Sequence, residues 1–145
     1  MKGRDFLTLA NSLASGTTEA EWRSAVSRAY YAAFHVAREL FESLGFQVPR
    51  SERAHNYLAI RLQNCGVAQV QSAGRNLDQL RGDRNFADYE VRKPFWHKNS
   101  AAQVQSAVLV IQILDSAKNE PARTQITDGM KVYEQTILRV VTWMP

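Results

Sequence analysis

The chain has 145 residues, of which 45% are hydrophobic and 22% charged, and its formal net charge is +4. This composition excludes a disordered chain and supplies enough apolar side chains for one folded domain with its own core. The single cysteine, Cys65, excludes an internal disulfide framework and argues against a cysteine-based metal site. No apolar run reaches the ~18–20 residues of a membrane helix. The first residues also lack the apolar segment of a signal peptide, so we expect a cytoplasmic protein with no membrane partner.

The basic residues are dominated by arginine, which supplies 13 of the 18 cationic side chains. The planar guanidinium group binds phosphates and carboxylates through two parallel hydrogen bonds. This bias favours an anionic partner. An arginine-rich, solvated surface is the alternative that charge alone leaves open.

The first half of the chain has helical periodicity. Apolar residues recur at intervals of three and four over residues 6–14, which predicts a short first helix. Thr18 and Glu21 then form the pattern of a capping box, in which each side chain binds the other's backbone amide. A long helix is expected from there to about Leu44, where Gly45 ends it. Its wide apolar face contains Trp22, Val26, Ala29, Tyr30, Ala33, Phe34, Val36, Ala37, Leu40 and Phe41.

The second half is also helical in its periodicity, except for residues 82–98, where Gly, Asp, Asn and Pro interrupt the pattern. Five or six helices with short connections predict an all-α, antiparallel up-and-down bundle that forms a single domain over residues 1–145. We expect a third helix from Ser51 to about Asn64, a fourth over residues 67–80, a fifth capped by Asn99, and a last helix after Pro121 that carries Ile126, Met130, Tyr133, Ile137 and Val140.

Three motifs in order resemble the HEPN family, and more narrowly its small stand-alone branch. The segment SRAYYAAFHVAR at residues 27–38 resembles the long second helix of the family, and RAHN at residues 53–56 resembles the start of its next helix. The segment LRGDRNFADY at residues 80–89 resembles that branch's signature of an arginine followed by Ala-Asp-Tyr. The resemblance covers about residues 20–118, and residues 119–145 would be a C-terminal helical extension.

Membership of the HEPN family would imply a helical bundle that pairs into a homodimer and brings two copies of one interhelical connection together. Active members cleave RNA without a metal or cofactor, using an arginine and a histidine that are separated by four to six intervening residues. Histidine titrates near neutral pH and can move a proton. Arginine supplies a permanent cation against the charge that develops on the phosphorus. The three histidines here are far apart in the sequence and lack metal-ligand spacing, so we expect no metal.

The sequence departs from this family pattern after Arg84, because the positions that would hold the histidine are Tyr89, Glu90 and Val91. Tyrosine is a poor base at neutral pH, but it can donate a hydrogen bond to phosphate or stack on a base. Asp88 could act as a base or hold Arg84 in place. We interpret Arg84, Asp88 and Tyr89 as the catalytic candidates because we expect them in a polar connection. A helical ion pair between Arg84 and Asp88 is the alternative.

Arg92 and His97 are secondary catalytic candidates. The arginine–histidine spacing occurs three times, and about one match is expected by chance. Only this pair falls in the connection where the family keeps its site. The neighbouring Phe95 and Trp96 could stack on a base or plug the loop from below. Four further residues are predicted to bind RNA or phosphate: Arg28, Arg81, Asn85 and Lys93.

The remaining aromatic and histidine residues favour structural interpretations. Tyr30, Tyr31 and Phe34 occur at helical spacing and are expected in the core. His55 is predicted to be a structural histidine near a helix end. A second face of the long helix would be solvated, or would form a dimer surface or RNA groove; it carries Arg28, Tyr31, His35 and Arg38.

Three functions remain open at this point. The first is an RNA-directed HEPN-like protein, either a metal-independent endoribonuclease toxin or a catalytically weakened relative in a toxin–antitoxin or defence system. The second is a non-enzymatic interaction module that partners a nucleotidyltransferase-like antitoxin. The third, a nucleotide binder, follows only from the family resemblance.

Overall fold

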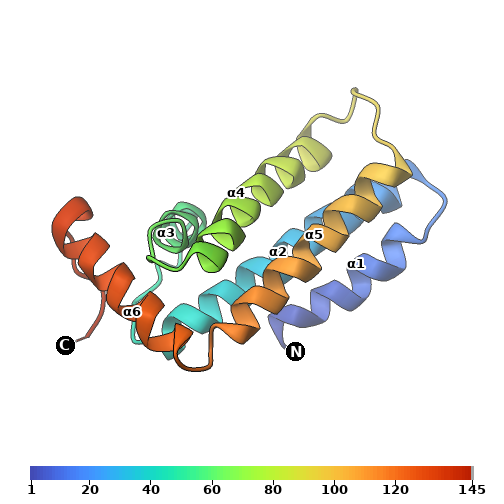
Figure 1. The fold of residues 1–145 in the computed structure, drawn as a ribbon. Helices are drawn as coiled ribbons and strands as arrows, with labels where there is room; N and C mark the ends of the chain where they lie inside the picture. Colours follow the sequence, from blue (N-terminus) through green and yellow to red (C-terminus); the bar gives the residue numbers. More distant parts are fainter. Residues whose placement is uncertain (145) are drawn as a thin grey trace.

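The computed structural model describes residues 1–144, which form six α-helices packed together (Figure 1). This confirms the all-α prediction and the expected number of helices. No helix in the described part is long and apolar enough to cross a membrane. In chain order the helices are α1 (Phe6–Ala14), preceded by the 3₁₀ turn Gly3–Asp5, α2 (Glu19–Ser43), α3 (Arg53–Leu62), α4 (Ala68–Tyr89), α5 (His97–Ser116) and α6 (Ala122–Tyr133), which continues into a π-helical turn, Glu134–Leu138.

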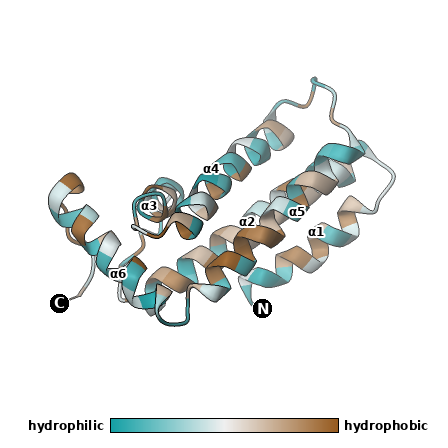
Figure 2. Ribbon diagram, viewed as in Figure 1, coloured by the Kyte–Doolittle hydropathy of each residue, from teal (hydrophilic) through white to brown (hydrophobic). Residues whose placement is uncertain are grey.

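The long helix α2 is the centre of the molecule and packs against α1, α4 and α5. The hydrophobic residues concentrate along α2 and α5 (Figure 2). The shorter α3 crosses the bundle beside α4, and α6 lies at the end opposite the α4–α5 connection (Figure 1). The arrangement leaves the junction of α2, α3 and α4 as the place where side chains from three helices meet.

The start of α2 confirms the predicted capping box. The Thr18 hydroxyl accepts a hydrogen bond from the Glu21 amide at 3.2 Å, and the Glu21 carboxylate accepts one from the Thr18 amide, also at 3.2 Å. Hydrogen bonds from the Thr18 hydroxyl and from backbone amides lower the pKa of Glu21. The other end of the helix is also as expected, because Gly45 takes a positive φ of 93° that ends the helix at little steric cost.

The predicted break over residues 82–98 is wrong in its first half. Helix α4 continues through Gly82 to Tyr89, and the connection to α5 comprises only residues 90–96. Glycine in a helix costs about 1 kcal/mol relative to alanine. Burial of Leu80 and Ala87 outweighs that cost, since each is about 1% exposed. The next helix begins at His97 rather than at a cap on Asn99.

The C-terminal segment folds back onto α3. Glu134 is completely buried and accepts hydrogen bonds from Arg61 Nε at 2.7 Å and from the Thr142 amide at 2.9 Å. The predicted helical position of Val140 is wrong, because the π-helical turn ends at Leu138 and the chain then leaves the helix. The tail is therefore fixed by a buried ion pair rather than by a continued helix.

Candidate functional site

Five side chains from three helices meet at the junction of α2, α3 and α4. The Arg84 guanidinium lies 5.3 Å from the ring centre of Tyr31 and 5.7 Å from that of Tyr30. The His55 ring stacks on Tyr30, with centroids 5.6 Å apart. Arg81 lies one turn before Arg84 on α4, on the same side of that helix. We call Tyr30, Tyr31, His55, Arg81 and Arg84 the Arg84 cluster.

The two tyrosines of the cluster pack in the core. Tyr30 is buried and meets Tyr31 edge-on, with centroids 5.3 Å apart. Phe34 lies one turn further along α2 and contacts His55 at 4.7 Å between centroids. The aromatic residues therefore form the core contact that was predicted for them. The side chains of Arg84 and His55 pack against these rings, which we call the aromatic floor of the cluster.

The surroundings of His55 favour its neutral form. Burial lowers its pKa below 6.5, and the positive charges of Arg81 and Arg84 lower it further. Burial also raises the pKa of Tyr30, which therefore keeps its proton. The Tyr30 hydroxyl is 2.5 Å from His55 Nδ1 and has no other acceptor among residues 1–144, so it donates to that nitrogen. The neutral ring then carries its proton on Nε2, which is a hydrogen-bond donor.

The two arginines of the cluster carry unused donors. The Nε atoms of Arg81 and Arg84 are buried and have no hydrogen-bond partner in the described part of the chain. The Arg84 side chain is only 11% exposed. Buried polar groups without partners are uncommon in folded proteins. Together with His55 Nε2, these guanidinium groups form a cationic site suited to an anionic oxygen.

Asp88 lies beside the cluster, one turn after Arg84. Its Oδ2 is 3.7 Å from Arg84 Nη1 and accepts a hydrogen bond from the Ser27 hydroxyl at 3.2 Å. Both contacts use the same oxygen, and Oδ1 has no partner within residues 1–144. A carboxylate with one anchored and one unused oxygen can accept a proton from a nearby hydroxyl.

The predicted catalytic residues do not lie in a loop. Arg84 and Asp88 lie within α4, not in a polar loop, and they form the helical ion pair that the sequence left as the alternative. Tyr89 is the last residue of α4 and its side chain is 73% exposed, away from the buried cluster. Asn85 is also exposed. The structure thus brings Arg84, Asp88 and Arg81 toward one site and leaves Tyr89 and Asn85 at the surface.

The secondary pair of Arg92 and His97 lies at the far end of α4. His97 begins α5, and its Nε2 donates to the Ala14 carbonyl at 2.9 Å. Its ring also packs against Trp22, with centroids 5.5 Å apart. Arg92 is exposed in the α4–α5 connection. His97 therefore joins α5 to the end of α1 through its Nε2.

Arg28 and Lys93, which were also predicted to bind RNA or phosphate, lie in different parts of the molecule. The Arg28 guanidinium packs over the rings of Phe6 and Tyr31, at 5.0 and 5.3 Å from their centres. Lys93 lies in the α4–α5 connection, 3.9 Å from the Glu90 carboxylate. Arg28 therefore borders the Arg84 cluster through their shared contact with Tyr31, whereas Lys93 belongs to the connection.

The sequence favours a structural role for His55, whereas the structure places it in the Arg84 cluster. The motif RAHN placed it at the start of a helix, which is correct because it lies in the first turn of α3. Its distance in sequence from Arg84 gave no indication that the two side chains share a site. The usable signal was that both belong to motifs of one family resemblance.

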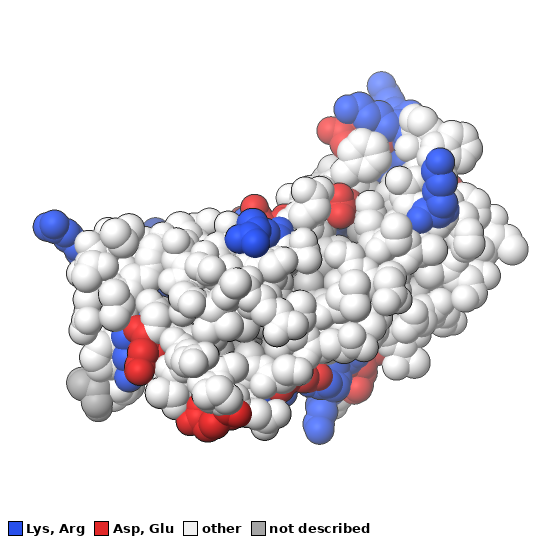
Figure 3. All heavy atoms as spheres, viewed as in Figure 1, with Lys and Arg blue, Asp and Glu red and all other residues white. Residues whose placement is uncertain are grey.

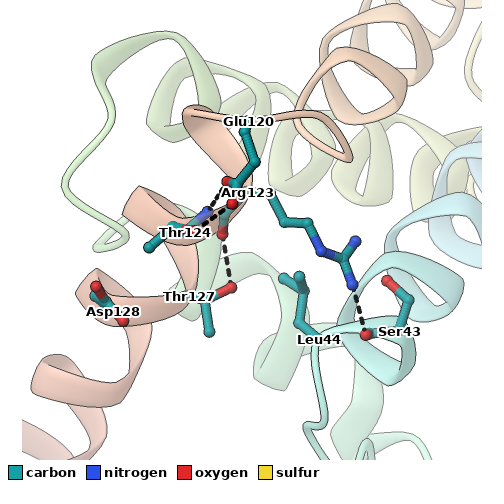
Figure 4. Close-up of a pocket in the computed structure, with 7 residues that line it drawn as sticks. All are labelled: Ser43, Leu44, Glu120, Arg123, Thr124, Thr127 and Asp128. Carbon is teal, nitrogen blue, oxygen red and sulfur yellow. Dashed lines mark hydrogen bonds between the residues drawn. The ribbon is translucent and has the colours of Figure 1, made fainter.

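A separate open pocket of about 230 Å³ lies between the C-terminal end of α2 and the start of α6 (Figure 4). Arg123 spans it and donates to the Ser43 carbonyl at 2.9 Å. Glu120 accepts hydrogen bonds from the amide and hydroxyl of Thr124, at 2.7 and 2.5 Å, and these lower its pKa. The carboxylate thus occupies the start of α6, where an anionic ligand would otherwise bind. The pocket is explained as a helix junction.

No group of three or more His, Cys, Asp or Glu side chains within residues 1–144 is arranged to hold a metal ion.

Comparison with known proteins found no matching family model, no matching curated protein and no matching solved structure. The interpretation of the site therefore rests on its own geometry and on the motif resemblance.

Proposed function

We propose that this chain is an RNA-directed protein of the HEPN type, whose Arg84 cluster receives an RNA phosphodiester. The observation that carries the proposal is the convergence of Arg81, Arg84 and His55 on an aromatic floor, with both arginine Nε atoms buried and unpaired. Cationic donors suit the phosphate groups of RNA. The three motifs that resemble the HEPN family support the same conclusion.

The reaction that this arrangement best supports is cleavage of RNA without a metal. Asp88 Oδ1 would accept the proton of a ribose 2′-hydroxyl as that oxygen attacks the adjacent phosphorus. Arg84 would stabilise the additional negative charge on the phosphoryl oxygens. The bond from phosphorus to the 5′-oxygen breaks and a 2′,3′-cyclic phosphate forms. The 5′-oxygen takes a proton from a water molecule, which regains a proton from Asp88. His55 Nε2–H would donate a hydrogen bond to the bound phosphate and would not act as the base.

Expression of the wild type, Arg84→Ala and His97→Ala in a bacterial host tests this proposal. We expect growth arrest and RNA fragmentation with the wild type and with His97→Ala, and neither with Arg84→Ala. Loss of both effects only with His97→Ala would instead assign the activity to Arg92 and His97. If the purified wild type neither binds nor cleaves RNA, the RNA-directed function is wrong.

A non-enzymatic interaction module is the second candidate. It is favoured by the absence of histidine among the residues that follow Arg84 at the family's spacing, since Tyr89 and Glu90 occupy those positions. Such a protein would bind a nucleotidyltransferase-like antitoxin and would co-purify with it. Robust nuclease activity of the isolated chain would rule this out. The resemblance also implies a homodimer in either case, which analytical ultracentrifugation measures directly.

A further inference from the structure

The α4–α5 connection, residues 90–96, is a fixed structure rather than a loose loop. Arg23 of α2 is buried and directs its guanidinium at this connection. It donates to the Ala87 carbonyl at 2.8 Å and to the Lys93 carbonyl, and so it joins the end of α4 to the middle of the connection. Phe95 is buried beneath the connection, 5.2 Å from the Arg23 guanidinium. A buried arginine and a buried ring therefore hold the backbone in one position.

This fixed connection displays an aromatic side chain to solvent. Phe95 is the plug that the sequence left as one of two alternatives, whereas the adjacent Trp96 is 59% exposed. Trp96 precedes α5 and makes no capping hydrogen bond through its side chain. An exposed tryptophan on a rigid backbone is already positioned for a flat partner, which lowers the entropic cost of binding.

Unpaired positive charge flanks this tryptophan. Figure 3 shows Lys and Arg side chains gathered at the end of the molecule where α4 joins α5. Arg92 and Lys98 are exposed and make no ion pair within residues 1–144, whereas Glu90 is matched by Lys93. An exposed aromatic ring with a free cation four residues before it and another two residues after it fits a chain that alternates flat bases with phosphates. An acidic protein surface would match the cations, but it does not offer a flat group beside every charge as a nucleic acid strand does.

We propose that Arg92, Trp96 and Lys98, here called the stacking tip, bind single-stranded RNA by stacking one base on Trp96 while the two cations contact neighbouring phosphates. This inference rests on the proposed function, because it names the form of RNA that the protein recognises. Bases in a duplex are already stacked on one another and present no free face to a tryptophan. The stacking tip therefore selects unpaired strands.

The test compares two strands that cannot be cleaved because their 2′-hydroxyls are methylated. One is a short oligoadenylate, and the other has the same backbone with abasic sugars. Fluorescence anisotropy measures their binding to the wild type, Trp96→Ala, Trp96→Phe and Leu109→Ala. Leu109 is a matched control, since it is an exposed apolar residue of α5 about 20 Å further along the helix.

We expect the wild type to bind the oligoadenylate about tenfold more tightly than the abasic strand, which corresponds to one stacked base. Trp96→Ala should abolish this difference without weakening the abasic strand, Trp96→Phe should retain part of it, and Leu109→Ala should retain all of it. Because Trp96 is exposed, the melting temperature should not change. If Trp96→Ala weakened binding to a duplex of the same sequence as much as binding to the single strand, selection of unpaired strands would be contradicted.

The binding data distinguish failure of the stacking tip from failure of the RNA-directed function on which it rests. If Arg84→Ala weakens both strands while Trp96→Ala weakens neither, the stacking tip is wrong and the RNA-directed function stands. If the wild type binds neither strand, both are wrong. Conversion of a dimer to a monomer by Trp96→Ala would assign the tip to a subunit interface and would also overturn the inference.

Discussion

Substitution of Arg23 by methionine should loosen the α4–α5 connection while leaving the rest of the bundle folded. Methionine keeps an unbranched side chain against Phe95 but removes the donors to the Ala87 and Lys93 carbonyls. Hydrogen bonds from a charged donor contribute about 1.5–3 kcal/mol each. Because water reaches part of the vacated site, we expect a total loss of about 2–4 kcal/mol. For a domain of this size that lowers the melting temperature by about 5–15 °C.

Urea denaturation and hydrogen exchange measure the two parts of this prediction. In the wild type the Glu90 amide donates to the Phe86 carbonyl and the Lys93 amide donates to that of Glu90, both at 3.0 Å. These amides should exchange faster in Arg23→Met, and the strand preference of the stacking tip should weaken. Arg23→Lys should be intermediate, and Arg75→Met, at an exposed position of α4, should have no effect. Unchanged exchange of both amides in Arg23→Met would refute the reasoning.

Three further predictions concern the cap, the tail and the site. Thr18→Ala should cost about 1 kcal/mol in urea denaturation through loss of the helix cap. Glu134→Ala should cost about 3–5 kcal/mol, because it leaves Arg61 buried without its carboxylate; a loss below about 1 kcal/mol would contradict the importance of this pair. NMR titration should give a pKa for His55 below 6.5 in the free protein. The folded protein should therefore lose stability as pH falls through ~6.5, where the unfolded chain binds the proton more readily. Bound RNA phosphate should raise the pKa of His55 by offsetting the charge of Arg84, and no change on binding would place the phosphate elsewhere.

Local patterns predicted the elements whose signals are local. The capping box of Thr18 and Glu21 and the end of the helix at Gly45 depend on a few neighbouring residues, and the sequence predicts both. The end of α4 depends instead on tertiary packing. Gly82 and the polar residues near it lower helix propensity, but burial of Ala87 against α2 extends the helix to its full length. Propensity alone therefore ended this helix too early.

The candidate site was only partly predictable for a related reason. Arg84 and Asp88 were identified from a motif, but their placement in a loop was wrong, and they form an ion pair on one helix face. His55 reaches the same site from α3, which crosses the bundle, and the sequence contains no signal for that crossing. Its hydrogen bond to Tyr30 and its low pKa likewise depend on contacts between helices.

Cleavage of RNA by the purified chain in the presence of a metal chelator tests the central claim most directly. The account predicts fragments ending in 2′,3′-cyclic phosphate from the wild type and from Arg75→Ala, a control on the same helix. It predicts none from Arg84→Ala and a large loss from Asp88→Asn, with all variants folded by circular dichroism. Cleavage by folded Arg84→Ala at the wild-type rate, or no cleavage and no RNA binding by the wild type, would contradict it.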